Sequence, residues 1–305
     1  MSALTIGVDL GGTHIRAVAF DDALEAVARA SAPTAAEEGV EAVVARVAEC
    51  VREVAGTEGL NGVGVGAAGL VDWRSGTVAL ASNLGWRDVP LRDLLSAALG
   101  DVPVRVDMDT NAAALAETRL GAGRGLRHLL YVTVGTGVGG AEVLDGRLYR
   151  GASGGAGQIG HVVVDPAGPR CGCGGQGCVE VYASGAGIVA RAREANVAGE
   201  LTTAAIFEAA AGGDPAAGAV IDAAADALGL ALATYVNLNN PEAILLGGGV
   251  ADAAPSYRER AERTLRQRAL PALADIVDVR PGALGGDAGA IGAALLLSED
   301  NGRST

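Results

Sequence analysis

Lysine is absent from this 305-residue chain, in which all 23 basic residues are arginine. Schiff-base enzymes, phosphate-loop NTPases and ordinary protein kinases each place a lysine ammonium group at a carbonyl or at phosphates. The missing lysine therefore excludes these three classes. An anionic ligand of this protein must instead be held by backbone amides, hydroxyl groups, arginine side chains such as Arg16, or a metal ion.

Aromatic residues and positive charge are also scarce. Aromatics make up 3% of the chain, and the formal net charge is −13 without a long run of either sign. We therefore expect no nucleic-acid partner, because no basic surface can release counterions and few rings can stack on bases. No basic segment precedes an apolar one at the N-terminus, and apolar stretches such as 129–141 are too short to span a bilayer. We expect a cytoplasmic protein with no membrane partner.

The composition is typical of a compact globular protein, with 50% hydrophobic residues and 47 glycines, and the length suggests roughly two domains. Strand and helix patterns alternate along the chain. Strands are predicted within 4–20, 63–71, 102–106, 129–144 and from 243, and helices over 39–54, 89–99, 111–120, 185–194, 204–211, 216–238 and 288–298. This alternation predicts an α/β fold.

An internal repeat becomes visible when the chain is shifted by about 124 positions. The segment 6–11 then falls on 130–135, and Asp21 falls on Asp145. Both copies have the same pattern of strand, glycine turn and strand. We expect two lobes of related design with a cleft between them.

Two glycine turns are candidate phosphate-binding loops. In the first, Asp9-Leu-Gly-Gly-Thr13, Gly11 and Gly12 let the backbone approach an oxyanion, Thr13 adds a hydroxyl donor, and Asp9 would face the accompanying cation. The alternative for this turn is a tight hairpin with an exposed aspartate. The second turn spans 133–140 and repeats the device with the residues Thr133, Gly135, Thr136 and Gly137.

A third glycine turn follows the predicted strand at 243. Its residues Gly247, Gly248 and Gly249 would let a flat ring lie against the backbone, although a strand that ends in glycines is often only a turn.

A carboxylate lies where the strand at 102–106 gives way to a helix. The sequence Asp107-Met108-Asp109-Thr110-Asn111 suits either a helix cap or a general base aimed into the cleft. Capping would lower the pKa of the carboxylate through the helix dipole. A weak base is still adequate for phosphoryl transfer, which depends mainly on positioning and charge neutralisation.

Three of the four cysteines cluster near a histidine. His161, Cys171, Cys173 and Cys178 supply one imidazole and three thiolates, which is a complete tetrahedral set for structural Zn²⁺. The alternatives are free thiols or an internal disulfide, and cysteines one residue apart do not easily bond each other. The metal would fix the loop that carries His161 and Glu180 beside the cleft.

These motifs together resemble the ROK family of sugar kinases, bacterial glucokinases among them, and sugar-responsive repressors. The resemblance runs from Leu4 to about Leu297, and its most specific part is the segment from Gly160 to Glu180. It implies the two-lobed actin/hexokinase-like (ribonuclease H-like) α/β fold, with ATP bound between the lobes and a sugar beside it. The small lobe would comprise residues 1–117 and 287–305, and the larger lobe 118–286 would hold the zinc.

The resemblance also implies roles for individual residues. Asp109 would take the proton from the primary hydroxyl of the sugar, with Mg²⁺ near Asp9. His161 would bind zinc through one ring nitrogen and turn the other toward the sugar. The expected sugar contacts are Asn111, His161 and Glu180, and the expected phosphate cradle is Gly11, Gly12, Thr13, Gly135, Thr136 and Gly137.

Two residues depart from the family pattern, in the expected sugar pocket. Met108 replaces a usual asparagine, and Gln158 replaces a usual glutamate. Methionine cannot hydrogen-bond a hydroxyl strongly, and glutamine exchanges a charged acceptor for a neutral group that also donates. We therefore expect an intact kinase machinery beside an altered sugar pocket.

The leading hypothesis is an ATP-dependent kinase of the 6-hydroxyl of a hexose, most often glucose in this family. An N-acetylhexosamine, an amino sugar or a cyclitol is the alternative substrate. The rival class is a sugar-binding regulator without catalysis; only eight residues precede Asp9, so direct DNA binding has little support. A homodimer or homotetramer is expected from the family.

Overall fold

The computed structural model describes residues 3–299 of the chain, which forms two compact units. Of the described residues, the first unit contains 3–124, Leu148–Ala156 and 286–299; the second contains Gly125–Arg147 and Gly157–Gly285. The predicted larger lobe, 118–286, contained 118–124 and 148–156, whereas in the structure both segments belong to the first unit. Gly154 and Gly155 lie against the backbone of Val71 and the side chain of Leu70.

The first unit is built on a five-stranded sheet of order β3-β2-β1-β4-β8. Its strands are β1 (Leu4–Leu10), β2 (His14–Phe20), β3 (Ala26–Pro33), β4 (Leu60–Ala67) and β8 (Val104–Met108). β1 pairs antiparallel with β2 and parallel with β4, and β4 is parallel to β8. The parallel strands β1, β4 and β8 therefore end at the same edge, and they bring the turn after Leu10 and the start of the helix after Met108 to that edge.

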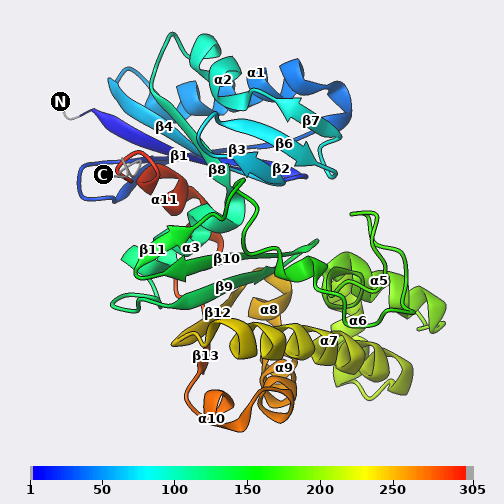
Figure 1. Cartoon of the computed structure of the whole chain (residues 1–305). Helices are drawn as coiled ribbons and strands as arrows, with labels where there is room; N and C mark the ends of the chain where they lie inside the picture. The colour runs from blue at the N-terminus through cyan, green and yellow to red at the C-terminus, as the bar shows by residue number, and fades with distance from the viewer. Residues whose placement is uncertain (1–2, 300–305) are drawn as a thin grey trace. The chain divides into compact units, whose positions relative to one another are not determined.

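Four helices accompany this sheet: α1 (Val40–Ala55), α2 (Leu91–Ala98), α3 (Asp109–Arg119) and α11 (Ala288–Leu295), with the 3₁₀ turns η1 (Ala36–Glu38) and η3 (Gly285–Asp287). The apolar face of α1 enters the main core of the unit. The closing helix α11 lies against β1, β4 and α3 (Figure 1). This approach requires glycine in the sheet, since a Cβ at Gly64 would lie 1.7 Å from the Ala293 oxygen.

A small antiparallel sheet in the first unit was not predicted. It consists of β5 (Leu70–Asp72), β6 (Thr77–Ala81) and β7 (Trp86–Val89), in that order. The sequence predicted one strand over 63–71, but β4 ends at Ala67 and β5 is separate. Strands of three to five residues show too few alternations to be recognised from periodicity.

The second unit repeats the plan of the first. Its sheet has the order β11-β10-β9-β12-β13, with β9 (Leu129–Val134), β10 (Val138–Leu144), β12 (Ala243–Gly247) and β13 (Asp278–Pro281). The edge strand β11 (Arg147–Tyr149) begins in the second unit, and its last two residues belong to the segment 148–156 of the first. β9 pairs antiparallel with β10 and parallel with β12, as β1 does with β2 and β4. The segment 6–11 falls on β1 and its turn, and 130–135 on β9 and its turn, so the internal repeat is confirmed.

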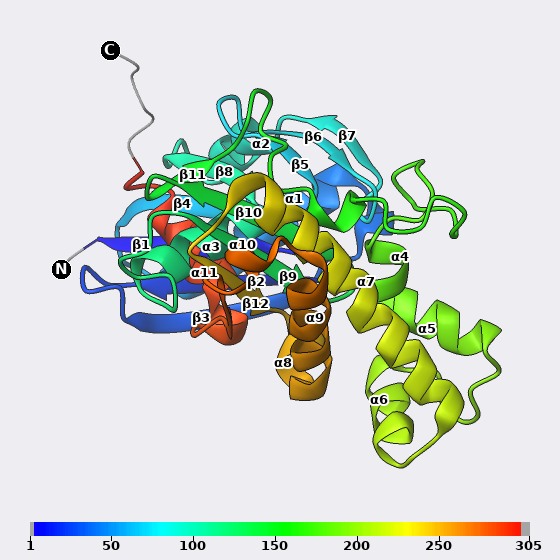
Figure 2. The same cartoon turned by 60° about the horizontal axis from the view of Figure 1, so that its bottom comes forward.

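The helices of the second unit are α4 (Glu180–Ala183), α5 (Gly185–Glu194), α6 (Thr203–Ala211), α7 (Pro215–Asn239), α8 (Gly249–Ala253), α9 (Pro255–Arg268) and α10 (Pro271–Ala274), with the 3₁₀ turn η2 (Ile159–His161). The long helix α7 begins with Asp214 capping its first turn and packs beside α9 (Figure 2). Arg260 of α9 donates to Asp226 of α7 at 2.7 Å.

Helix α7 is the one helix within residues 3–299 that is long and apolar enough to cross a membrane. However, 61% of its most apolar 18-residue window is buried inside the protein, where its side chains form much of the core of the second unit. Burial of this kind accounts for its apolar composition.

Candidate functional site

The first glycine turn connects β1 to β2 in the first unit. The Gly11 N–H donates to the backbone oxygen of His14 at 3.0 Å. The Thr34 hydroxyl also stabilises the turn, because it donates to the Gly11 oxygen at 2.7 Å. Gly12 lies against the side chain of Asn83, a neighbour that the sequence did not single out. The turn that contains Gly11, Gly12 and Thr13 is thus braced by hydrogen bonds to neighbouring segments.

Asp9 ends the strand before this turn. Burial raises the pKa of its carboxyl group, and Arg16, whose nitrogen lies 3.7 Å away, partly offsets that rise. A Cβ at Gly289 would lie 3.0 Å from the carboxyl carbon of Asp9, so the start of α11 closely approaches this side chain. The carboxylate is therefore only weakly neutralised by the protein itself, as expected of a group that faces a bound cation.

Asp109 is the first residue of α3, at the end of β8. Its Oδ1 accepts the Thr110 N–H at 2.7 Å. Glycine at position 66 of β4 permits this helix start to pack close, because a Cβ there would lie 3.2 Å from the Cα of Asp109. The side chain is thereby held at the same sheet edge as Asp9.

The prediction that a capping role would lower the pKa of Asp109 is wrong. The residue before the helix, Met108, is the N-cap and provides no side-chain cap, and Asp109 itself belongs to the helix. Burial, and then the negative charge of Asp9, raise the pKa of Asp109 to about 7. Desolvation and a like charge outweigh the favourable helix dipole here.

The two neighbours of Asp109 that were predicted to contact sugar are buried in the first unit. Met108 is 1% exposed and belongs to the main core of that unit, and Asn111 is fully buried. Asn111 Nδ2 donates to Asp107 at 2.7 Å, while its Oδ1 makes no hydrogen bond within residues 3–299. Their role as sugar contacts stays a prediction.

The second glycine turn connects β9 to β10 in the second unit. The Gly135 N–H donates to the Gly137 oxygen at 2.9 Å, and the Gly135 oxygen accepts the N–H of Gly185 at 2.8 Å. Gly185 is the first residue of α5, so this helix begins directly beside the turn. Thr136 is also linked to this helix, because its backbone oxygen accepts the Ala186 N–H at 3.4 Å.

The third glycine turn lies next to the second. Gly247 pairs with Thr133 in the sheet, and Gly248 has φ +91°. A Cβ at Gly248 would lie 2.6 Å from both the Thr133 hydroxyl and the Val134 oxygen. By contrast, a Cβ at Gly135 or at Gly249 would meet no heavy atom within 4 Å. The structure thus brings the two turns together in the second unit and leaves open space beside each of them.

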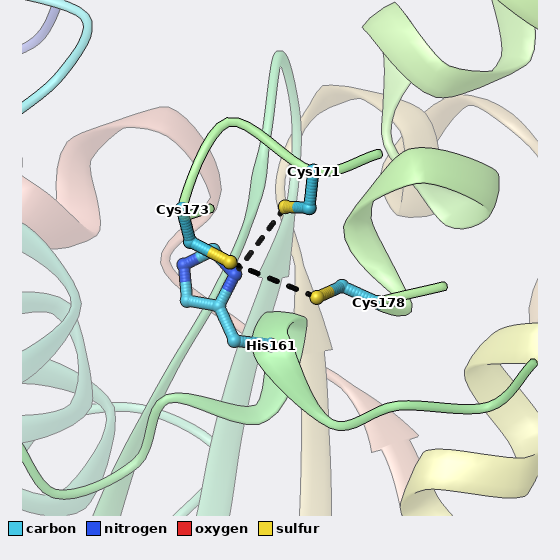
Figure 3. Close-up of side chains that lie close together, drawn as sticks. All are labelled: His161, Cys171, Cys173 and Cys178. Atoms are coloured by element: carbon cyan, nitrogen blue, oxygen red, sulfur yellow. Dashed lines mark hydrogen bonds between the residues drawn. The ribbon is translucent and has the colours of Figure 1, made fainter. Parts of the chain in front are cut away.

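His161 and the three clustered cysteines converge on one point. Their ligand atoms all lie within 4.8 Å of one another (Figure 3). The distances are 3.8 Å between the Cys173 and Cys178 sulfurs and 3.8 Å between the Cys171 sulfur and His161 Nδ1. Zn–S bonds of about 2.3 Å place tetrahedral sulfur atoms about 3.8 Å apart, so this donor set fits Zn²⁺. The same separation rules out a disulfide between Cys173 and Cys178.

Glycines shape the cysteine loop. The Cys171 N–H donates to the Gly175 oxygen at 2.9 Å, and Gly177 adopts φ +68°. Without a metal, burial and the neighbouring thiols raise the pKa of Cys178 to about 12. A bound divalent ion reverses this effect, because a coordinated thiol is deprotonated outright.

Glu180 connects the cysteine loop to the second glycine turn. It begins α4, two residues after Cys178, and its Oε2 accepts the Val138 N–H at 3.0 Å. A Cβ at Gly137 would lie 2.6 Å from the same oxygen. Gln158 precedes the η2 turn and is exposed, and its backbone oxygen accepts the backbone N–H of His161 at 3.1 Å. The predicted metal, sugar and phosphate residues of the second unit thus form one connected structure.

Sequence and structure comparisons identify relatives along nearly the whole chain. A sequence model of the ROK family matches residues 5–300. A glucokinase of Halalkalibacterium halodurans is 38% identical over 313 residues, covering 96% of this chain and 94% of the relative. An N-acetylmannosamine kinase of Citrobacter koseri is 34% identical over 299 residues, covering 97% and 99%.

A solved structure agrees with the sequence relatives. The ROK family glucokinase from Streptomyces griseus, in complex with glucose and AMPPNP, matches with a TM-score of 0.87 and 36% identity, covering 96% of this chain and 99% of that one. These matches and the paired sheets confirm the predicted α/β fold of the actin/hexokinase type. The chain belongs to the ROK family.

Proposed function

We propose that this protein is an ATP-dependent kinase that transfers a phosphoryl group to the 6-hydroxyl of a hexose, with glucose as the first candidate. Membership of the ROK family supports this proposal, as do the 38% identical relative named glucokinase and the similar structure solved with glucose and AMPPNP. The phosphate donor and the sugar class follow from the same relatives.

The observation that carries the proposal is the environment of Asp109. Its carboxyl group is anchored at the start of α3 and has a pKa raised to about 7. A general base is most effective when its pKa lies near the working pH, because it is then both ionised and basic enough to accept a proton. An ordinary surface aspartate, with a pKa near 3.9, is a much weaker base.

The only group of the protein that takes part in bond making in the proposed reaction is Asp109, which accepts one proton. Asp109 accepts the proton of the sugar hydroxyl while that oxygen forms a bond to the γ-phosphorus. The bond from this phosphorus to the bridging oxygen breaks, and ADP leaves with the electron pair. Most of the rate enhancement in such reactions comes from positioning and charge stabilisation.

The glycine turns are suited to hold the phosphates in place of lysine. Backbone N–H groups and the hydroxyls of Thr13, Thr133 and Thr136 are the available donors. Asp9, half-buried and only partly neutralised by Arg16, is the residue that would hold Mg²⁺. When bound, this ion neutralises charge on the phosphates.

The cysteine cluster fits a structural Zn²⁺, and its role here is to orient sugar contacts. His161 presents Nδ1 to the cysteines, which leaves Nε2 for a sugar hydroxyl. Glu180 and Gln158 flank the same loop and would add further contacts. Assembly as a homodimer or homotetramer and a cytoplasmic location stay predictions.

An N-acetylhexosamine is the second candidate substrate. Gln158 stands where a charged acceptor is usual, and one relative with 34% identity over nearly its full length is named N-acetylmannosamine kinase. A neutral amide that both donates and accepts suits an acetamido group better than a carboxylate does.

An ADP-release assay with purified protein over hexoses, N-acetylhexosamines, amino sugars and cyclitols tests the proposal. We expect the highest kcat/KM with glucose; a higher value with an N-acetylhexosamine selects the second candidate. Asp109→Asn should lower kcat by about 10²-fold to 10⁴-fold while leaving the fold intact. If no sugar is phosphorylated but one binds by calorimetry, the kinase proposal fails and the protein is a sugar-binding regulator.

A further inference from the structure

A buried ion pair includes Asp107, which lies two residues before the proposed base Asp109. Arg150 Nε donates to Asp107 Oδ2 at 2.6 Å, and the side chains are only 14% and 3% exposed. Both residues belong to the first unit, although the chain on either side of Leu148–Ala156 belongs to the second. The sequence had indicated no role for Arg150.

The carboxylate of Asp107 also binds the residues on both sides of Asp109. Its Oδ1 accepts the Met108 N–H at 2.8 Å and Asn111 Nδ2 at 2.7 Å. The N-cap residue Met108 provides no side-chain cap for α3, and these two bonds instead fix both Met108 and the first turn of the helix to Asp107. The Arg150 guanidinium in turn fixes the orientation of the Asp107 carboxylate.

Asn111 is suited to this internal contact. It is fully buried, and because a carboxylate only accepts hydrogen bonds, Asp107 determines that Nδ2 faces it. The bond from Nδ2 to Asp107 satisfies a buried amide donor, which would otherwise cost free energy.

We propose that Arg150, Asp107 and Asn111 form a brace that positions the base Asp109, and that Asn111 acts through this brace rather than as a sugar contact. This inference rests on the proposed kinase function. Asp109 lies between the two anchored positions, so loss of the brace lets the first turn of α3 shift. A displacement of about 1 Å at a reacting group can cost on the order of 10²-fold in rate.

Arg150→Met tests the brace, and Arg74→Met is its matched control. Both guanidinium groups lie 4.8 Å from the centre of the Trp73 ring, but Arg74 is exposed and makes no bond to Asp107. We expect Arg150→Met to lower kcat on the order of 10²-fold with KM values changed less than about threefold, and Arg74→Met to leave both unchanged. Arg150→Lys should recover part of kcat, because it restores the charge but not the planar fork.

Removal of one charge from a buried pair can prevent folding. The double variant Asp107→Asn/Arg150→Met removes both charges and keeps the test decisive if the single variant is insoluble. In a double-mutant cycle, Asp107→Asn and Asn111→Leu should be strongly non-additive in kcat, since each change breaks the same brace. A rise in the KM for sugar at unchanged kcat in Asn111→Leu would show a direct sugar contact and overturn the proposal.

Hydrogen–deuterium exchange tests the brace independently of turnover. The Met108 amide should exchange faster in Arg150→Met than in the wild type, and at the wild-type rate in Arg74→Met. Equal exchange and equal kcat in the two variants would refute the brace. If the wild type phosphorylates no sugar, the kinase function fails, whereas the exchange rates still decide whether Arg150 fixes the start of α3.

Discussion

The Glu180 carboxylate accepts the backbone N–H of Val138 at 3.0 Å. This bond connects Glu180, two residues after Cys178, to the first residue of β10, the strand that follows the second glycine turn. The opposite side of Val138 is also in close contact, because a Cβ at Gly160 would lie 2.0 Å from the Val138 oxygen. Gly160 directly precedes the candidate metal ligand His161, so the segment 160–180 contacts the backbone of Val138 at both polar groups.

Loss of the Glu180 carboxylate should affect both stability and substrate binding. Glu180→Ala leaves the buried N–H of Val138 unpaired, which costs about 1–3 kcal/mol of unfolding free energy. Glu180→Gln keeps an acceptor oxygen and should unfold close to the wild type, while still raising the KM for sugar. Urea denaturation and steady-state kinetics of the two variants measure these effects; equal stability losses would contradict the specific role of the Val138 bond.

An alanine scan of two glycines should separate packing from ligand binding. At Gly160 a Cβ clashes with the Val138 oxygen, and we expect Gly160→Ala to destabilise the protein by about 1–3 kcal/mol. At Gly135 a Cβ meets no atom within 4 Å, so Gly135→Ala should fold normally and mainly raise the KM for ATP. Thermal unfolding and kinetics with varied ATP distinguish the two. A normal melting temperature for Gly160→Ala would be inconsistent with the observed packing.

The pH dependence of activity should follow the ionisation of Asp109. The base works only when ionised, and its pKa is raised to about 7, so kcat/KM should rise with pH up to about 7 and then level off. A rate profile from pH 5 to 9, with buffers of constant ionic strength, measures this. A profile that is already flat at pH 5 would show that the base titrates near its ordinary value.

Ionisation of Asp109 should lower the free energy of unfolding as the pH rises, although it raises the activity. The ordinary pKa of 3.8 applies to the unfolded chain, so the folded protein binds this proton more tightly. The contribution of Asp109 therefore favours folding below about pH 4 and is lost as the pH rises toward 7. Asp109→Asn should remove this part of the pH dependence, which unfolding curves of both proteins at pH 5 and 8 would show.

Removal of zinc should lower the stability of the second unit. We expect about one zinc per chain by elemental analysis, because the donor set is a single tetrahedral site. Cys178→Ser should lower both the zinc content and the melting temperature, whereas Cys50→Ala, which changes a buried cysteine of α1 outside the cluster, should keep the zinc. Full zinc content in Cys178→Ser would remove this residue from the ligand set.

Several features were predictable from the sequence because they depend on local patterns. The cysteine spacing predicted the cluster, which the structure brings within 4.8 Å, and the shift of 124 positions predicted the repeated sheets. Helix α1 begins and ends within one residue of its predicted bounds, since its apolar residues recur at helical spacing. The hairpin of β6 and β7 was missed, because strands this short show no clear period.

The alternation of strands and helices predicted the α/β class, the glycine turns predicted phosphate-binding loops and the cysteine spacing predicted the metal cluster, because these patterns act through the backbone and through neighbours in the sequence. The resemblance to the ROK family added the expected sugar, ATP and actin/hexokinase-like fold. The tertiary structure decided the properties that depend on distant residues. Asp9 lies 100 positions from Asp109 in the sequence yet raises its pKa, and Arg150 binds Asp107 across 43 positions. Burial and charge at a site are set by what packs around it, so only the folded chain shows how Asp109 is tuned and held.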